Sequence, residues 1–225
     1  MILPTITTTK PNWKSKIKEV EKLGIKELAF FLTCLDLTER QEFYKLAEEA
    51  KIKNVPFVHI RSDMDLKELD YLVRNYKTKV FNIHTQLDFP LIYDYSKYKN
   101  IIYIENSPAF PFQEKELKDF AGICLDLTHL ENDWLTNKNK FEREIKILEK
   151  YPIGCNHISA IKDKIYKKEE GTNHYDAHSF EELSEFNYLK KYPKKYFSSL
   201  IALELENTLE EQLKVKDYIL HENFC

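Results

Sequence analysis

Side chains of the kind that bind metal ions follow the apolar segments of this sequence. The segment GICLDLTH begins as a buried strand would and ends in Asp126 and His129. His59, His84 and Glu105 also stand at or directly after the ends of apolar runs. Imidazole and carboxylate groups are common ligands of Zn²⁺ and Mn²⁺ in proteins. These residues therefore indicate a metal site, provided that the fold brings the ends of the runs together.

The second half of the chain adds more side chains of this kind. They belong to the last two apolar runs and to the segment between them, and they are His157, His174, Asp176, His178, Glu204 and Glu206. The phase of the last strand leaves open whether Glu204 or Glu206 faces inward. A single histidine at a strand end is more often a hydrogen-bonded structural residue than a ligand. Several carboxylates crowded at one rim would repel each other unless cations lay among them, so the whole set favours a metal site.

Eight apolar runs alternate with segments of helical periodicity, and the runs must position these side chains. The runs span residues 2–6, 27–33, 56–60, 79–84, 101–105, 122–127, 153–158 and 199–206. Continuous apolar runs are typical of strands buried on both faces, and their alternation with helices predicts a parallel sheet. Eight such units predict an α/β fold, a compact (β/α)8 TIM barrel that forms a single domain over residues 1–225. A doubly wound open sheet competes with it, but the first turn has no glycine for a nucleotide phosphate.

The carboxyl ends of the strands in such a barrel meet at one mouth, where the active sites of these enzymes lie. One ion needs three or four protein ligands and an open position, so the number of candidates indicates two or three ions. A mixed set of imidazoles and carboxylates favours Zn or Mn. Clustered ions suit the hydrolysis of phosphate esters, whereas a sugar isomerisation needs only one ion and a carboxylate base.

Charge and hydropathy narrow the classes of partner. The chain has 34 Lys and Arg against 37 Asp and Glu, a net charge of -3, so it carries no global basic field for nucleic acid, although a local basic patch stays open. No window approaches the roughly 18 apolar residues of a membrane span, and the start lacks the pattern of a secretion signal. The four cysteines show no CxxC pair, which suits reduced thiols. We expect a cytoplasmic protein without a membrane partner, and the sequence leaves its oligomeric state open.

The motifs around these residues resemble those of the xylose isomerase-like barrel superfamily, and most closely those of its endonuclease IV type of apurinic-site nuclease. The motif YIENS is similar to that family's strand-five motif, and LDLTH, NHIS, YDAH and ALEL are similar to its later motifs. The resemblance spans residues 57–206 and implies nine metal ligands: His59, His84, Glu105, Asp126, His129, His157, Asp176, His178 and Glu204. It implies that Glu105 bridges ions. The sequence departs from the family at Ala160, where an aspartate usually stands three residues after the strand-seven histidine.

We expect from these observations a metal-dependent phosphoester hydrolase, and in its narrower form a phosphodiesterase or an enzyme like an apurinic endonuclease. Glu105 and Glu204 would be its catalytic residues and would orient the attacking water. The alternative is a metal-dependent sugar or sugar-phosphate isomerase or epimerase, in which the same two glutamates flank one ion and shuttle a proton. A barrel that binds a ligand at its rim without catalysis is a third interpretation.

The substrate classes that these activities imply are a phosphorylated small molecule, a sugar or an abasic nucleic acid. Arg61 and Lys162 are the candidates for contact with a substrate phosphate, because they lie close in sequence to candidate ligands. An ion pair of Arg61 with Asp63 or Asp65 is the other interpretation of that residue. For Lys162 the other interpretation is a solvated surface loop.

Overall fold

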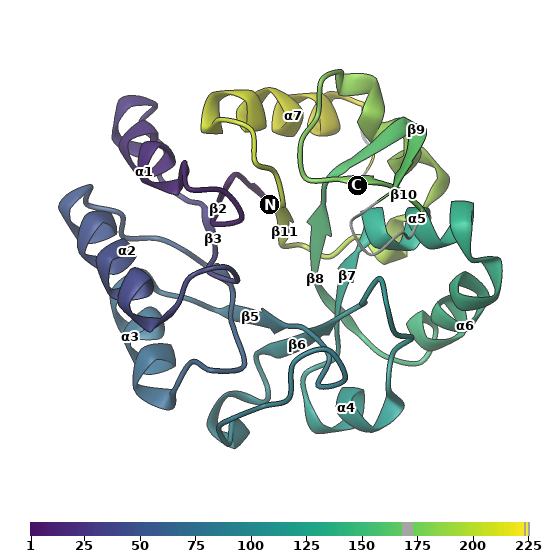
Figure 1. Cartoon of the computed structure of the whole chain (residues 1–225), viewed down its shortest axis with the longest axis horizontal. Coiled ribbons are helices and arrows are strands. Elements are labelled where there is room, and N and C mark those ends of the chain that lie inside the picture. The colour runs from purple at the N-terminus through teal and green to yellow at the C-terminus, as the bar shows by residue number, and fades with distance from the viewer. Residues whose placement is uncertain (168–172, 223, 225) are drawn as a thin grey trace.

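A parallel β-sheet that nearly closes on itself forms the centre of the protein, as a computed structural model shows for residues 1–167, 173–222 and 224 (Figure 1). Its strands are β1 (Ile2–Leu3), β2 (Thr5–Thr7), β3 (Ala29–Phe31), β4 (Phe57–His59), β5 (Val80–Ile83), β6 (Ile102–Glu105), β7 (Ile123–Asp126), β8 (Ile153–Ile158) and β11 (Ile201–Leu203). In the described part of the chain they follow the order β1-β11-β8-β7-β6-β5-β4-β3-β2, and all paired neighbours are parallel. The predicted parallel α/β sheet is confirmed, and every expected run contains a strand.

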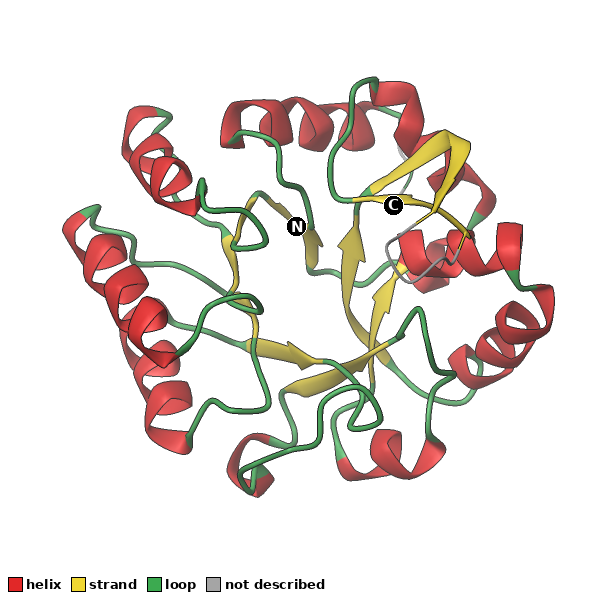
Figure 2. Ribbon diagram, in the orientation of Figure 1, coloured by secondary structure: helices red, strands yellow, loops and turns green. Residues whose placement is uncertain are grey.

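Helices surround this sheet (Figure 2). The α-helices are α1 (Trp13–Lys22), α2 (Leu37–Glu49), α3 (Leu66–Tyr76), α4 (Glu114–Asp119), α5 (Leu127–Thr136), α6 (Lys138–Leu148) and α7 (Leu209–His221), and the 3-10 helices are η1 (Ser96–Tyr98), η2 (Leu183–Lys191) and η3 (Lys194–Tyr196). Among the residues described, no helix combines the length and the apolar character that a bilayer crossing requires.

Two connections depart from a regular alternation of strand and helix. The connection after β5 contains only the short η1 before β6 begins. After β8 the chain forms an antiparallel hairpin of β9 (Ala160–Lys167) and β10 (Asn173–Ala177), where a solvated surface loop around Lys162 was one interpretation of the sequence. That interpretation is wrong for Lys162, because the backbones of the two segments pair with each other, in a register that a bulge shifts between His174 and Asp176. The hairpin packs against α5.

The sheet closes at a seam that side chains bridge. β1 pairs with β11 and β2 pairs with β3, and only Pro4 separates β1 from β2. Beyond this break, the buried amide of Gln212 in α7 accepts a hydrogen bond from the backbone N–H of Thr5 at 2.7 Å. The same amide donates to the carbonyl oxygens of Thr5 and Leu205, at 3.1 and 3.0 Å. Buried Lys16 donates to the Leu205 carbonyl at 2.8 Å. Side chains thus replace part of the ladder between β2 and β11.

A small apolar cluster lies on the face of the sheet that carries the candidate ligands. Its buried members are Leu3, Ala29, Phe31, Phe57, Cys124, Cys155 and Ala202. Side chains two residues apart on a strand face the same side, so Cys124 shares a face with Asp126, and Cys155 with His157. The ring of His157 lies 4.6 Å from that of Phe31, between ring centroids. The cluster therefore forms an apolar floor under the site and limits the positions of the polar side chains above it.

We predict that Gln212→Leu lowers the free energy of unfolding by about 1–3 kcal/mol, because the buried N–H of Thr5 loses its acceptor, whereas the carbonyl of Leu205 keeps Lys16 as a donor. Urea denaturation followed by circular dichroism measures the change. The control is Glu210→Gln, on the exposed first turn of the same helix, and we expect it to change stability by less than about 0.5 kcal/mol. A Gln212→Leu protein as stable as the wild type would show that the seam does not depend on this amide.

Candidate metal centre

Five buried side chains of ligand type meet at the carboxyl ends of five strands. They are His59 of β4, Glu105 of β6, Asp126 of β7, His157 of β8 and Glu204 directly after β11. His59, Glu105 and His157 form one group, and Glu105, Asp126, His157 and Glu204 form a second. Within each group, one ligand atom from each residue lies within 4.8 Å of all the others. Glu105 and His157 belong to both groups, so the two candidate ligand sets overlap.

Glu105 and His157 stand in the middle of this cluster. Nδ1 of His157 lies 3.3 Å from Oε1 of Glu105 and 3.4 Å from Oε2 of Glu204. On the other side, Nε2 of His59 lies 3.5 Å from Oε2 of Glu105. The two oxygens of Glu105 therefore face different histidines, which is the arrangement that a bridging ligand requires.

Asp126 is held rigidly because it also caps a helix. Its Oδ1 accepts hydrogen bonds from the backbone N–H groups of Thr128 and His129, at 2.6 and 2.9 Å, at the start of α5. Its own backbone N–H donates to Oδ1 of Asn106 at 2.7 Å. A carboxylate at this position also interacts favourably with the helix dipole. The cap leaves Oδ2 of Asp126 for the cluster, at 3.7 Å from Nε2 of His129.

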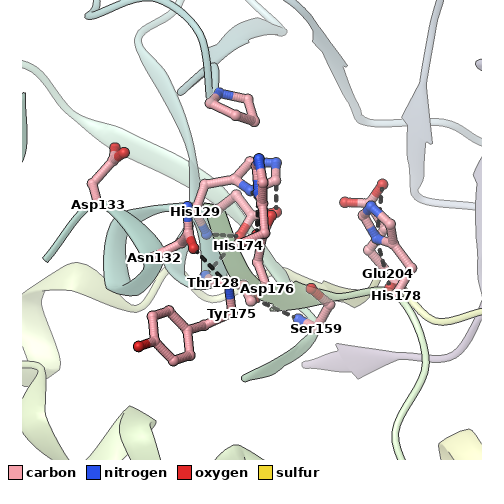
Figure 3. A network of polar contacts seen from close by, with 12 residues as sticks. Thr128, His129, Asn132, Asp133, Ser159, His174, Tyr175, Asp176, His178 and Glu204 are labelled. Carbon is pink, nitrogen blue, oxygen red and sulfur yellow. Dashed lines mark hydrogen bonds and ion pairs between the residues drawn. The ribbon is translucent and has the colours of Figure 1, made fainter. Parts of the chain in front are cut away.

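The hairpin contributes a second carboxylate beside His129 (Figure 3). Oδ2 of Asp176 lies 3.1 Å from Nδ1 of His129, and Oδ1 of Asp176 lies 2.7 Å from Nδ1 of His174. Burial lowers the pKa of His129, but Asp126 and Asp176 more than reverse this and raise it to about 10. Asp126, His129, Asp176 and His174 thus form a chain of alternating carboxylates and imidazoles that leads away from the cluster.

The last two histidines of the expected set lie at the edges of the cluster. The ring of His84 contacts that of His59 edge to face, with 4.6 Å between the ring centroids. Nδ1 of His178 lies 3.7 Å from Oε1 of Glu204, and both side chains come from neighbouring backbone in Figure 3. The fold thus brings all nine expected ligands into one connected network, of which five form the compact centre.

The structure distinguishes Glu204 from Glu206. Glu204 lies in the cluster, whereas Glu206 forms an ion pair with Lys10 outside it. β11 ends at Leu203, so the alternation of the strand no longer determines the direction of either side chain. The backbone N–H of Glu204 donates to the carbonyl of Ile158 at 2.8 Å, and this bond holds Glu204 beside the end of β8.

The two candidates for phosphate contact are engaged in ion pairs. The guanidinium of Arg61 binds both carboxylate oxygens of Asp63, at 2.9 and 3.1 Å, and donates to the carbonyl of Thr33 at 2.7 Å. Nζ of Lys162 in β9 lies 2.9 Å from a carboxylate oxygen of Glu185. Each cation already has an acidic partner, so a substrate phosphate would compete with that partner.

Several buried polar atoms of the centre have no hydrogen-bond partner among the described residues. They are both ring nitrogens of His59 and of His157, Oδ2 of Asp126 and Oε2 of Glu204. A buried polar atom without a partner costs about 1–3 kcal/mol, and native proteins rarely leave so many together. Divalent cations among these atoms would satisfy them. Imidazole with carboxylate is a donor set for Zn, Mn or Fe rather than for Ca or Mg, so these residues fit such ions.

Carboxylates and imidazoles offset each other's charge across the centre. Burial alone would raise the pKa of Glu105, but His157 and His59 hold it well below its usual value. Burial likewise opposes ionisation of Glu204, and His178 and His157 lower its pKa to about 2. Burial lowers the pKa of His59 to about 3, so its ring is neutral at pH 7. Glu105 and Glu204 more than reverse the effect of burial on His157 and raise the pKa of its ring, and burial raises the pKa of Asp126. Ionised carboxylates and neutral imidazoles are the forms that bind metals, so His157 would lose its proton when an ion binds.

A cleft of about 820 Å³ opens beside the centre. His84 and His174 both line it, so the two ends of the network reach the same cleft. A second hollow, of about 540 Å³, lies between α2 and α3 and is lined by none of the expected ligands. None of the five residues of the compact centre lines the larger cleft, which therefore borders the network only at its two ends, His84 and His174.

Two polar residues of the site are absent from the sequence-based set of ligands. Nδ2 of Asn82 in β5 donates to Oε2 of Glu105 at 2.7 Å and holds that carboxylate in place. Its spacing of two residues from His84, at the end of the same run, was the signal that could have identified it. His174 was noted in the sequence, but only the structure shows its contact with Asp176.

The sequence matches no family model and no curated protein. The resemblance to the xylose isomerase-like superfamily therefore stays a prediction based on the motifs alone. The geometry of the site is the independent observation on which its chemistry can be argued.

We predict that Zn²⁺ or Mn²⁺ stabilises the metal-free protein, by about 2.7 kcal/mol per site at 100 times the dissociation constant. Differential scanning calorimetry with added ion measures the effect. Glu105→Gln should lose most of it, because the carboxylate shared by both ligand groups is removed. Glu206→Gln is the control and should keep it, since Glu206 pairs with Lys10. Equal stabilisation of both variants would show that the ions bind elsewhere.

We also predict that the free energy of unfolding of the metal-free protein decreases as the pH falls from 6.5 towards 3. The unfolded chain takes up a proton on His59 in this range, whereas the folded protein does not, because burial lowers the pKa of this ring to about 3. The contribution reaches about 1.4 kcal/mol per pH unit. Urea denaturation at several pH values should show a shallower slope for His59→Gln, and an identical slope would contradict the assignment.

Proposed function

We propose that the chain is a metal-dependent phosphoester hydrolase that holds two or more divalent ions at the mouth of a (β/α)8 barrel. The overlap of two ligand groups at Glu105 and His157 carries this proposal. Together with His84, His129 and His178 at its edges, the cluster offers more ligands than one ion needs. Centres with more than one ion suit displacement at phosphorus, because attacking and leaving oxygens both need charge stabilisation.

The interpretation as a (β/α)8 barrel is supported by the seam. If β1 and β2 are counted as one strand interrupted at Pro4, the sheet has eight strands and closes between β11 and β3. The candidate ligands then lie at the end of the barrel where enzymes of this fold carry their active sites. The narrower activity is cleavage at abasic sites of nucleic acid. Only the motif resemblance supports it.

The residues of the centre have distinct roles in this proposal. Bound ions would lower the pKa of an attacking water and offset the charge on the phosphoryl oxygens. Glu105 would link the two ligand groups, since its oxygens face His157 and His59 separately. Glu204 has one oxygen without a hydrogen-bond partner and would orient the water. Asn82 would fix the position of Glu105 through its hydrogen bond.

A sugar or sugar-phosphate isomerase or epimerase is the second candidate, and one observation favours it. Glu105, Asp126, His157 and Glu204 form a group of four without help from the other residues, which is enough for a single ion. Glu105 and Glu204 both contact Nδ1 of His157, so a substrate between them would have a carboxylate within reach on each side. Such a pair can move a proton between neighbouring carbons.

We predict that the protein reconstituted with Zn²⁺ or Mn²⁺ hydrolyses p-nitrophenyl phosphate or bis(p-nitrophenyl) phosphate, measured by the release of nitrophenol. Glu105→Gln and Glu204→Gln should each lower kcat/KM by about 100-fold or more, because each removes a carboxylate that holds an ion or the water. Glu206→Gln should keep the wild-type rate.

Metal analysis of the same preparations separates the two candidates. Two or more ions per chain support the hydrolase, and one ion with no ester hydrolysis under either metal argues against it. In the latter case, incorporation of solvent deuterium into a ketose phosphate would support the isomerase. A protein that retains neither ion and is insensitive to chelator would contradict both.

A further inference from the structure

The cleft beside the metal centre has walls from four separate segments. They are the connection after β5, the connection after β6, the second half of α5 and the hairpin of β9 and β10. The first and last of these are the two irregular connections of the fold, and Figure 1 shows the hairpin beside α5. With about 820 Å³, the cleft has the size of sites that enclose most of a small organic molecule.

The charged side chains along this cleft, among the residues described, are acidic. Within residues 1–167 and 173–222, no lysine or arginine lines it, and its charged side chains are those of Asp88 and Asp133. Asp133 already pairs with Nζ of Lys140 at 2.6 Å, and this buried ammonium also donates to the carbonyl of Ser107. Nucleic acids are bound through several contacts of Lys and Arg to their phosphates. The residues described offer no such contacts along this cleft.

Exposed apolar side chains converge on the same cleft. Phe89, Leu135 and Ile165 line it, and they are 54%, 42% and 49% exposed. They come from the connection after β5, from α5 and from β9, so the fold brings together residues that are far apart in the sequence. Large exposed apolar side chains gathered in one place mark binding sites. The ring of Phe89 also lies 5.3 Å from that of His84, between centroids, at an angle of 35°.

Amide side chains complete the walls. Asn132, Asn137 and Asn173 line the cleft, and each can donate and accept hydrogen bonds without a net charge. Oδ1 of Asn132 accepts from the backbone N–H of Tyr175 at 2.9 Å, which leaves its amide N–H groups for a ligand. Apolar faces with a few neutral hydrogen-bonding groups are typical of sites for flat organic molecules.

We infer that this cleft binds an uncharged, flat and partly apolar group of the substrate, while a single phosphoryl group lies at the metal centre. The inference rests on the proposed function for the position of the phosphoryl group. It adds the chemical class of the rest of the substrate. The substrate is then a small ester of an aryl-like or other planar alcohol. A nucleic-acid strand, with a phosphate at every nucleotide, does not fit the walls described above.

Calorimetric titration of the zinc-loaded protein with benzylphosphonate and with methylphosphonate tests the inference. The two probes share the phosphonate and differ in the ring, so burial of the ring should make benzylphosphonate bind about 10-fold tighter or more. Phe89→Ala and Leu135→Ala should reduce this preference. Leu220→Ala is the matched control, because Leu220 is 51% exposed on α7 and does not line the cleft.

A second experiment, on the metal-free protein, tests the inference independently of the proposed function. In the metal-free protein, benzamide should shift NMR signals of the cleft more strongly than acetamide does, and Leu135→Ala should weaken the effect. The inference would be overturned if the two amides gave equal responses, or if the two phosphonates bound equally or not at all. Tight binding of an oligonucleotide with a steep salt dependence would also overturn it. Ring-dependent binding without ester hydrolysis would refute the hydrolase and leave the cleft assignment standing.

Discussion

Three carboxylates and an imidazole are buried together in a space of a few ångströms, and this concentration of charge constrains everything around it. Glu105, Asp126 and Glu204 each bring an oxygen within 4.8 Å of the others and of a nitrogen of His157. Buried carboxylates repel one another and lack the hydration that would stabilise them. The protein offsets the charge with imidazoles on several sides, but atoms of Asp126, Glu204 and two histidines have no hydrogen-bond partner among the described residues. Divalent cations would complete such an arrangement, whereas apolar packing would not.

The parallel sheet makes this concentration possible, because it places the ends of strands that are far apart in sequence side by side. The hydrogen-bonded neighbours β6, β7 and β8 deliver Glu105, Asp126 and His157 to one rim. Local structure then fixes each side chain: the start of α5 binds one oxygen of Asp126, and Asn82 binds one of Glu105. The rigidity that a metal centre requires thus comes from backbone ladders and helix caps, and a small apolar cluster supports it from below.

The strands and the approximate place of the ligands were predictable from the sequence, for a simple reason. An apolar run that ends in His59, Glu105 or Asp126 reports both a buried strand and the position where it leaves the core. The hairpin after β8 was not predictable in this way, because β9 mixes apolar and charged residues and contains no continuous apolar run. Its strands pair with each other and not with the barrel-like sheet. The choice of Glu204 over Glu206 likewise depended on a backbone bond to Ile158 that no local pattern encodes.

The two irregular connections explain how one rim of the sheet carries both the candidate metal ligands and an apolar cleft. A regular helix after β5 and after β8 would leave the rim to short loops, and neither Phe89 nor Ile165 would reach the cleft. An extended connection and a hairpin in place of these helices lack helical hydrogen bonds but place apolar walls beside the candidate metal centre. Departures from a regular fold are expected where function requires them, and both departures here border the same cleft. The candidate ligands lie on the strands and the cleft walls lie on the connections. In the proposed enzyme, the chemistry at the metal centre and the choice of substrate would therefore be encoded by different parts of the chain.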